Sequence, residues 1–313
     1  MLKQWTRNVC GLILAAVFVA TASHAQDLAF PGPASGLPDG VQALIDKGQF
    51  HDAEQALRGY LKQNDHSAAA HELLAYALLR QNKPRESLEE YTRSAAIERP
   101  SAEMLERVGQ DYVLLNDYAD ADAWTLRAVQ MEPSYADGWY SLGRIRYTEQ
   151  RFSDAQSCFQ KSVSLSPKSV KAENNLGLTY EALNQTDAAI AAYRQAIAWQ
   201  NDGPHEQRSE QPLLNLGIVL LHRSALAEAE PLLVEAAEIA PKDPGIRGQL
   251  GHLYMQKADY AAARRELEQA CALDAKNSSL HYLLGQVYRR LGLQEEAKAE
   301  FATSERLVNA SRP

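Results

Sequence analysis

The histidines and cysteines are the side chains whose spacing could support metal or nucleophilic chemistry, and they complete no motif. His71 and Glu72 begin a His-Glu-x-x-His pattern typical of zinc proteases, but Ala75 stands where the second histidine would be. Without it the metal lacks a ligand pair on one helical face, so we interpret His71 as structural. The sequence contains no Gly-x-Ser-x-Gly, no phosphate-binding glycine loop and no Cys-x-x-Cys. We therefore predict a protein that is not an enzyme and has no cofactor and no metal site.

A recurring glycine indicates which elements must position the remaining polar side chains. Glycine stands at Gly109, Gly143 and Gly177, and again at Gly217, Gly251 and Gly285, each with alanine twelve residues later. Successive glycines within each trio are separated by the same number of residues, and the separation between Gly177 and Gly217 is six residues longer. A fixed period of this size is typical of stacked repeats, which form binding surfaces more often than enclosed catalytic pockets.

The repeat can be numbered so that the glycine is position 8. The repeats then begin at Ala68, Ala102, Ala136, Val170, Glu210, Pro244 and Ser278, after a degenerate first repeat from about Ala34 to Ser67. Apolar or small residues recur at positions 7, 8 and 11 and at 20, 24 and 27, which is helical spacing. Each repeat is therefore predicted to be two antiparallel helices joined by a short turn.

The glycines lie inside predicted helices, so close packing must compensate for their low helix propensity. Glycine inside a helix costs about 1 kcal/mol relative to alanine, so close helix–helix approach has to offset that cost. We expect position 8 to face position 20 across the helical hairpin, and the small position 27 to admit the next repeat.

Residues 1–25 form a separate segment. Lys3 and Arg7 precede an apolar run from Val9 to Ala22, and small residues then lead to Ala25. This pattern predicts a secretory signal peptide, cleaved before Gln26, and hence an exported protein, periplasmic or secreted. An uncleaved membrane anchor is the alternative, but a span takes roughly 20 apolar residues, more than this run contains.

Charge and cysteine usage narrow the possible partners. The net charge is −8, and removal of the two cations of residues 1–25 gives −8 − 2 = −10. An acidic chain does not attract nucleic acid or anionic lipid through its overall field. Cys158 and Cys271 lie in different repeats, far apart along the chain, and are expected to be buried free thiols.

The pattern resembles the tetratricopeptide repeat (TPR) family over about residues 34–311. The family prefers Leu-Gly at positions 7–8, Tyr at 11, Ala at 20, Tyr or Phe at 24, Ala at 27 and Pro at 32, and the segment Ala136 to Gly143 is close to its opening helix. The resemblance implies an all-α fold, an α-solenoid of about eight helix-turn-helix repeats in a right-handed superhelix. The expected organisation is a signal peptide (1–25), a Pro/Gly-rich leader (26–38), repeats one to five (39–200), a loop insertion (201–212) and repeats six to eight (213–311).

The resemblance also implies a concave groove lined by the first helices, through positions 2, 5, 6, 9, 12 and 13. The side chains at these positions that we expect to line the groove are Arg107, Tyr140, Ser141, Arg144, Tyr147, Lys171, Asn174, Asn175, Asn215, His222, Gln249, His252, Tyr282, Arg289 and Arg290. Asn175, Asn215 and Gln249 share position 6 of successive repeats, a polar ladder suited to an extended peptide backbone. The tyrosines and cations suit an acidic or C-terminal carboxylate ligand. The alternative is a solvated face without a ligand.

Two ligand types are disfavoured. The two-carboxylate clamp of chaperone-binding TPR proteins needs lysine at position 5, and no repeat has it. His222 and His252 lie on the groove side of adjacent repeats but have no cysteine or carboxylate partner nearby for a metal.

The sequence therefore predicts an exported adaptor or scaffold that binds a protein or peptide. The alternatives are a self-associating subunit of an envelope assembly, paired through the C-terminal repeat, and an accessory protein of secretion or polysaccharide machinery.

Overall fold

The computed structural model describes residues 37–204 and 208–310, and all regular elements in these ranges are α-helices. The predicted signal peptide and most of the leader lie outside the described residues. The chain divides into two compact parts between Ser166 and Pro167, called here the N-terminal half and the C-terminal half.

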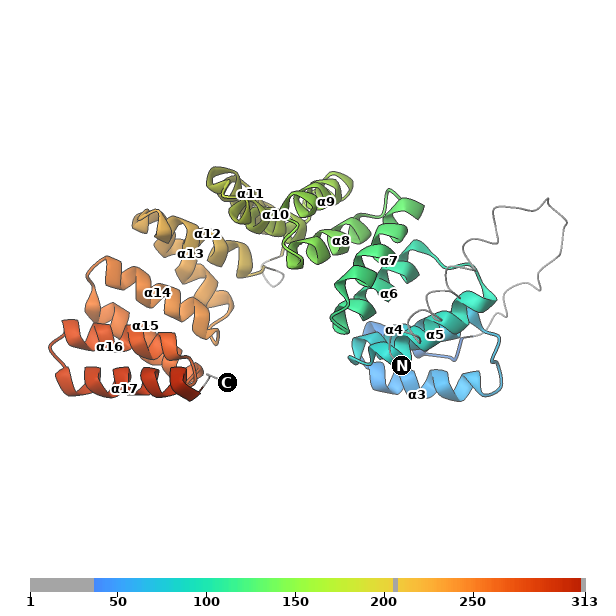
Figure 1. Ribbon diagram of the computed structural model, residues 1–313, viewed down its shortest axis with the longest axis horizontal. Helices are drawn as coiled ribbons and strands as arrows, with labels where there is room; N and C mark the ends of the chain where they lie inside the picture. The colour runs from blue at the N-terminus through green and yellow to red at the C-terminus, as the bar shows by residue number, and fades with distance from the viewer. Residues whose placement is uncertain (1–36, 205–207, 311–313) are drawn as a thin grey trace. The chain divides into compact units, whose positions relative to one another are not determined.

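The N-terminal half contains eight helices in its described residues (Figure 1). They are α2 (Val41–Asp46), α3 (Phe50–Leu61), α4 (Ala68–Arg80), α5 (Pro84–Ile97), α6 (Ala102–Leu114), α7 (Tyr118–Met131), α8 (Ala136–Thr148) and α9 (Phe152–Leu165). The described residues of the C-terminal half also form eight helices. They are α10 (Val170–Ala182), α11 (Thr186–Asn201), α12 (Gln211–His222), α13 (Leu226–Ile239), α14 (Pro244–Gln256), α15 (Tyr260–Leu273), α16 (Ser278–Arg290) and α17 (Gln294–Ala310).

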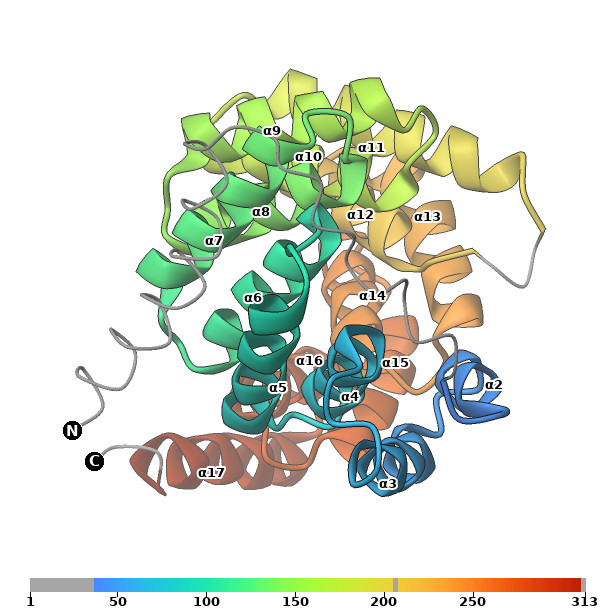
Figure 2. The same cartoon turned by 90° about the vertical axis from the view of Figure 1, so that its right-hand side faces the viewer.

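Within each half every helix packs on the next one along the chain, which gives the paired appearance of Figures 1 and 2. The prediction of an all-helical repeat fold is confirmed. Six first helices begin at the residue expected to open a repeat, and α12 begins at Gln211, one residue after the expected Glu210. Residues 205–207, inside the predicted insertion, are not described.

A left-handed residue at position 15 ends the first helix of every repeat. It is Gly48 in the first repeat and then Asn82, Asn116, Gln150, Asn184, Ser224, Ala258 and Gly292, with φ between 57° and 80°. After it the chain reverses within two residues into the second helix. The same turn therefore recurs with different residue types but a single backbone conformation.

The ring or branched side chain at position 24 lies over the position-8 glycine, a contact that the prediction of a position-20 partner did not include. A Cβ built on Gly143 would lie 2.7 Å from Cε1 of Phe159, and one built on Gly251 would lie 2.5 Å from Cγ of Leu267. Position 20 also lies against position 8, as expected: the Ser87 hydroxyl donates to the Ala75 carbonyl (2.9 Å), and a Cβ built on Gly109 would lie 3.2 Å from the Ala121 carbonyl. The long side chain reaches the glycine because helical side chains point back toward the N-terminus of their own helix.

Position 4 carries a second repeated contact, which fastens the first helix to the preceding linker. In four repeats a side-chain N–H at this position donates to the carbonyl six residues earlier. The pairs are His71 with Asp65 (3.0 Å), Trp139 with Pro133 (3.0 Å), Arg247 with Pro241 (3.1 Å) and His281 with Ala275 (3.2 Å). The donor differs in chemistry, but the acceptor carbonyl always belongs to position 32 of the repeat before.

The core follows the repeat frame within each half. The alanines at position 20 are at most 3 % exposed, and Tyr91, Phe159 and Tyr193 at position 24 are fully buried. Cys158 and Cys271 are free and buried, as predicted. Among the described residues no helix is both long and apolar enough to cross a membrane.

Candidate functional site

The first helices of successive repeats contact one another directly in each half. In the N-terminal half α6 contacts both α4 and α8, and in the C-terminal half α12 contacts α10 and α14, while α14 also contacts α16. Each half thus presents a continuous surface of first helices, called here its first-helix face. The predicted groove residues belong to four such helices in the C-terminal half and two in the N-terminal half.

The first-helix face of the N-terminal half contains a hollow of about 410 Å³. It is lined by Leu79, Arg80, Asn82, Gln110, Val113, Leu114, Tyr118, Ser141, Arg144, Ile145 and Thr148. Arg80 and Arg144 are the charged residues of this lining, which includes no acidic side chain. Leu114 is 41 % exposed and adds an apolar surface beside them. The hollow is therefore suited to a ligand with negative charge and some apolar character.

Arg80 is held in place by two aromatic side chains. Its Nη1 donates to the Tyr76 hydroxyl (2.8 Å), and its guanidinium lies 4.7 Å from the centre of the Phe50 ring. Contacts of this kind reduce the freedom of a long cationic side chain before it meets a ligand. Arg80 is at position 13 of its repeat, a groove position, although the predicted set began only at Arg107.

Arg144 and Tyr140 are predicted groove residues on α8. Arg144 is exposed, and its guanidinium lies 5.9 Å from the centre of the Tyr140 ring, which itself packs on Phe159. Tyr147, further along α8, packs edge-on against Phe152 at 5.3 Å. Aromatic contacts with second-helix residues thus fix how both tyrosines sit on the surface.

A buried carboxylate underlies the hollow. Glu106 is 4 % exposed and accepts hydrogen bonds from Gln110 (2.6 Å) and from Ser141 (2.5 Å). Burial raises the pKa of Glu106 despite these two bonds. Gln110 and Ser141 both line the hollow, so Glu106 positions two of its polar side chains while remaining out of contact with solvent.

Arg107, the first predicted groove residue, is already engaged in ion pairs. Its guanidinium pairs with Glu103 and with Glu72 (3.5 Å), and it lies 4.4 Å from the centre of the Tyr76 ring. Burial raises the pKa of Glu72, and the charge of Arg107 opposes that rise. Arg107 therefore serves mainly to balance neighbouring carboxylates.

The expected polar ladder of the C-terminal half has a different pairing in the structure. Asn215 donates to the side-chain oxygen of Asn174 (3.0 Å), and Asn175 donates to the Lys171 carbonyl of its own helix (2.8 Å). Asn174 is only 8 % exposed. The Asn215–Asn174 bond joins α12 to α10, and Asn174, predicted to line the groove, is poorly accessible to a ligand.

The remaining predicted residues of the C-terminal half differ in exposure. Lys171, His222, Tyr282, Arg289 and Arg290 are exposed, whereas Asn175, Gln249 and His252 are half-buried. Burial and then the nearby charge of His222 lower the pKa of His252, so these two imidazoles lie close enough to repel one another when protonated. Arg289 lies 5.8 Å from the centre of the Phe301 ring.

His71 is structural, as expected from its broken motif. It is 5 % exposed, and its Nδ1 lies 2.5 Å from Oε2 of Glu90 while its Nε2 donates to the Asp65 carbonyl. Glu90 also accepts from Arg93 (2.6 Å). Both ring nitrogens are therefore occupied by the fold.

Comparison with known proteins identifies the repeat. Residues 39–103 and 140–204 match the tetratricopeptide repeat family, residues 251–292 match a TPR repeat, and residues 278–307 match a further tetratricopeptide repeat. Anaphase-promoting complex subunit CDC16 of Saccharomyces cerevisiae is 29 % identical over 178 residues, which are 55 % of this chain and 20 % of that protein. The human protein O-mannosyl-transferase TMTC3 is 25 % identical over 183 residues, with the same two shares. The chain thus spans about a fifth of the length of these relatives.

Solved structures share the fold at low identity. The Cut9–Hcn1 hetero-tetramer of the anaphase-promoting complex aligns with a TM-score of 0.60 and 18 % identity, covering 85 % of this chain and 52 % of the matched chain. Pseudomonas aeruginosa pilF aligns at 0.59 and 18 %, covering 67 % and 93 %. PilW, a type IV pilus biogenesis factor, aligns at 0.57 and 20 %, covering 64 % and 90 %.

Proposed function

We propose, because this chain is a tetratricopeptide repeat protein, that it is a non-enzymatic scaffold that binds an extended segment of a partner on its first helices. The observation that carries the proposal is the hollow on the N-terminal first-helix face, whose charged lining residues are Arg80 and Arg144. Guanidinium groups bind carboxylates through paired hydrogen bonds, so the preferred ligand has an acidic side chain or a free C-terminus. An apolar side chain of the same ligand would contact Leu114.

The C-terminal first-helix face is a second, separate candidate surface. Lys171, His222, Tyr282 and Arg289 are exposed there, and Asn175, Gln249 and His252 are half-buried. The cations Lys171 and Arg289 and the aromatic Tyr282 match the cationic lining of the hollow, which supports an acidic partner for a chain whose net charge is −8.

The test compares two double variants that remove the same charge from the same half. Arg80→Ala with Arg144→Ala removes both cations of the hollow, and Arg85→Ala with Arg127→Ala removes two exposed cations of α5 and α7. Each protein is probed against an array of acidic peptides with free C-termini and against an extract of the cell envelope. Binding should survive in the second variant and fall by about tenfold or more in the first, since hydrogen bonds to charged groups contribute roughly 1.5–3 kcal/mol each. Equal binding by both variants would remove the hollow from the proposal.

We further propose export of the chain, on the charged and apolar pattern of residues 1–25. Fractionation of cells that express the full chain, or the chain without residues 1–25, tests it. Cytosolic retention of both forms would contradict it. An accessory role in an envelope machine is one function compatible with such a location, and the similar fold of PilW, a pilus biogenesis factor, supports it.

Self-association is a second candidate, favoured by exposed apolar side chains near the C-terminus. Leu273, Tyr282, Leu291 and Val308 are between 38 % and 52 % exposed, and they make up four of the seven exposed large apolar side chains in the described ranges. Light scattering over a concentration series should show a mass increase that deletion of residues 278–313 abolishes. A constant monomer mass would reject this candidate.

A further inference from the structure

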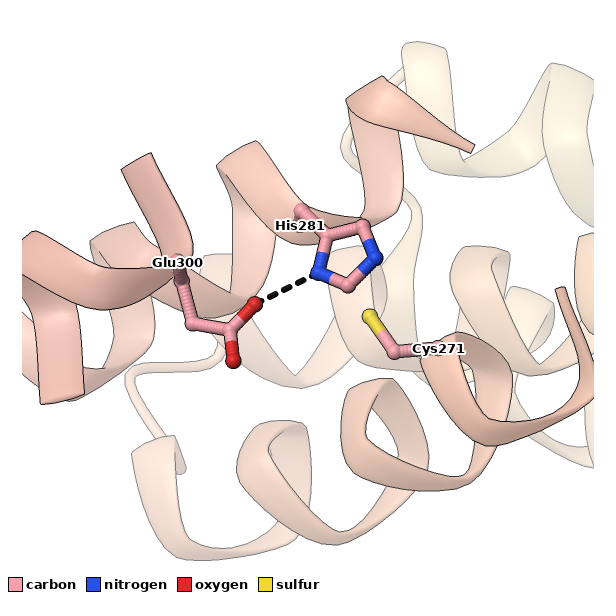
Figure 3. Close-up of side chains that lie close together, drawn as sticks. All are labelled: Cys271, His281 and Glu300. Carbon is pink, nitrogen blue, oxygen red and sulfur yellow. Dashed lines mark hydrogen bonds and ion pairs between the residues drawn. The ribbon is translucent and has the colours of Figure 1, made fainter. Parts of the chain in front are cut away.

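Cys271, His281 and Glu300 bring three different metal-binding groups together in the C-terminal half. Cys271 lies on α15, His281 on α16 and Glu300 on α17, and Figure 3 shows the thiol and the carboxylate both facing the imidazole. One ligand atom from each residue lies within 4.8 Å of the other two. The helix α16 packs on both α15 and α17, so the backbone holds the three side chains near one another.

The imidazole of His281 is already oriented as metal-binding histidines are. Its Nε2 lies 3.2 Å from the Ala275 carbonyl, which only accepts, so Nε2 carries a proton. Its Nδ1 lies 2.5 Å from Oε2 of Glu300, and a single proton is shared at this contact. In most metal sites the histidine that binds the metal through one ring nitrogen donates the N–H of the other to a backbone carbonyl, a carboxylate or water.

A second His–Glu pair, His71 with Glu90, has the same geometry but lacks the neighbouring thiol, and it serves as a comparison for a pair with a structural role alone. His71 and Glu90 have the same 19-residue separation and nearly the same distances as His281 and Glu300. At the position ten residues before the histidine, however, Leu61 stands in place of Cys271. Arg93 neutralises Glu90, whereas Thr303 occupies the corresponding position beside Glu300.

We propose that Cys271, His281 and Glu300 form a site for Zn²⁺, bound through Sγ, Nδ1 and a carboxylate oxygen. Zinc prefers thiolate, imidazole and carboxylate ligands in a tetrahedron, and three protein ligands leave the fourth position to water. Ligand atoms in such a tetrahedron lie roughly 3.3–3.8 Å apart, as bond lengths of about 2.0–2.3 Å require. The His281–Glu300 contact must open by roughly 1 Å and the thiol must move inward by up to about 1.5 Å, which side-chain rotation can provide.

The ion replaces the proton shared by His281 and Glu300 and the proton of the thiol. Burial, and to a smaller extent the negative charges of Glu300 and Asp274, raise the pKa of Cys271 to about 11. The side chain is therefore a thiol at neutral pH when no metal is bound. Bound zinc would connect α15, from one repeat, to both helices of the next repeat. Its effect is therefore structural, as it stabilises one repeat boundary.

The experiment uses the purified full chain without a histidine tag, with Zn²⁺ measured by competition against a chromophoric chelator and Co²⁺ as a spectroscopic probe. We expect one high-affinity zinc per chain and a thiolate-to-cobalt charge-transfer band. We also expect a melting temperature that rises by roughly a few degrees with zinc and returns with chelator. Cys271→Ala should abolish the band and weaken zinc binding by roughly tenfold or more. Alanine occupies the equivalent position at Ala95 and Ala237, so this variant should fold normally.

Matched controls separate the site from other thiols and from the other His–Glu pair. Cys158→Ala removes the other buried thiol and should keep the cobalt band. Glu90→Gln should keep zinc affinity, and Glu300→Gln should lower it. Absence of the cobalt band in the unaltered chain, or unchanged zinc affinity in Cys271→Ala, would overturn the proposal.

Discussion

The ring of Phe159 on α9 covers Gly143 on α8, with Cε1 2.7 Å from the point where a Cβ would stand. The same covering relationship occurs between Gly285 and Phe301. In the repeat that begins at Ala68, however, Ala75 takes position 8 beneath the fully buried Tyr91. A ring at position 24 is thus compatible with alanine at position 8.

This comparison predicts different outcomes for two substitutions at Gly143. Gly143→Ala should change the free energy of unfolding little, because the gain of about 1 kcal/mol in helix propensity offsets the displaced ring. Gly143→Leu should destabilise by about 1–3 kcal/mol through overpacking. Urea denaturation measures both. The control is Gly59→Leu on α3, where a Cβ meets nothing within 4 Å, and a similar loss there would show that the packing contact is not the cause.

Ala258 predicts a stabilising change. It occupies the left-handed turn position with φ of 57°, where a residue with a Cβ is strained by roughly 1 kcal/mol or more. Ala258→Gly should therefore raise the melting temperature, and Gly292→Ala, at the same position of the next repeat with φ of 80°, should lower it. If both substitutions shift the melting temperature in the same direction, the turn does not control stability in this way.

Asp111 predicts a pH dependence of stability. It is fully buried, its Oδ2 lies 2.7 Å from the Ser87 hydroxyl oxygen, and burial raises its pKa to about 8 in spite of the hydrogen bond with Ser87. Because this pKa is above the value of 3.8 for a free carboxyl, the folded state favours the protonated acid. The associated stability is complete below about pH 4 and is lost as the pH rises through about 8.

Asp111→Asn removes this titration. The difference in unfolding free energy between pH 5 and pH 9 should be smaller in the variant, on the order of a few kcal/mol at about 1.4 kcal/mol per pKa unit. Urea titrations at the two pH values provide the measurement. Parallel pH profiles for the variant and the unaltered chain would mean that Asp111 does not titrate in this range.

Glu54 predicts a pH dependence of stability opposite to that of Asp111, because its pKa in the folded state is lowered. Burial alone would raise its pKa, but hydrogen bonds from Lys83 (2.8 Å), Arg58 (2.8 Å) and Gln81 (3.0 Å) outweigh it and lower the pKa to about 2. The stability that depends on this carboxylate is present above about pH 4.5 and is lost as the pH falls toward 2.

Glu54→Gln should therefore destabilise the chain at pH 7 by about 1–3 kcal/mol, and the difference should shrink as the pH falls below 4. Thermal melts across this range test it. Glu89→Gln, at an exposed position of α5, is the control and should have little effect. A difference that does not change with pH would assign the loss at Glu54 to shape and not to charge.

The repeat frame was predictable because it depends on periodic residue types. The glycines at position 8 locate the starts of the first helices to within one residue, since helix spacing and close packing both recur with the period of the glycines. The first-helix surface could be expected for the same reason.

The detailed contacts were not predictable from that frame. The burial of Asn174 against Asn215 and the covering of Gly143 by Phe159 depend on which side chain reaches which backbone between helices. Arg80 occupies a groove position, and its spacing was the available signal, but its contact with the Phe50 ring of α3 is a tertiary contact. Cys271 belongs to one repeat and His281 and Glu300 to the next, so the sequence of a single repeat does not bring the three residues together.

The position-4 contact shows that a role can be kept while its residue changes. A histidine, a tryptophan and an arginine, three side chains that share little in size or charge, all close the same six-residue loop by offering one N–H to one carbonyl. A catalogue of tolerated substitutions would rank this position as variable. Trp139→His would nevertheless be a milder change than Trp139→Phe, because geometry, and not hydrophobicity, defines what the position requires.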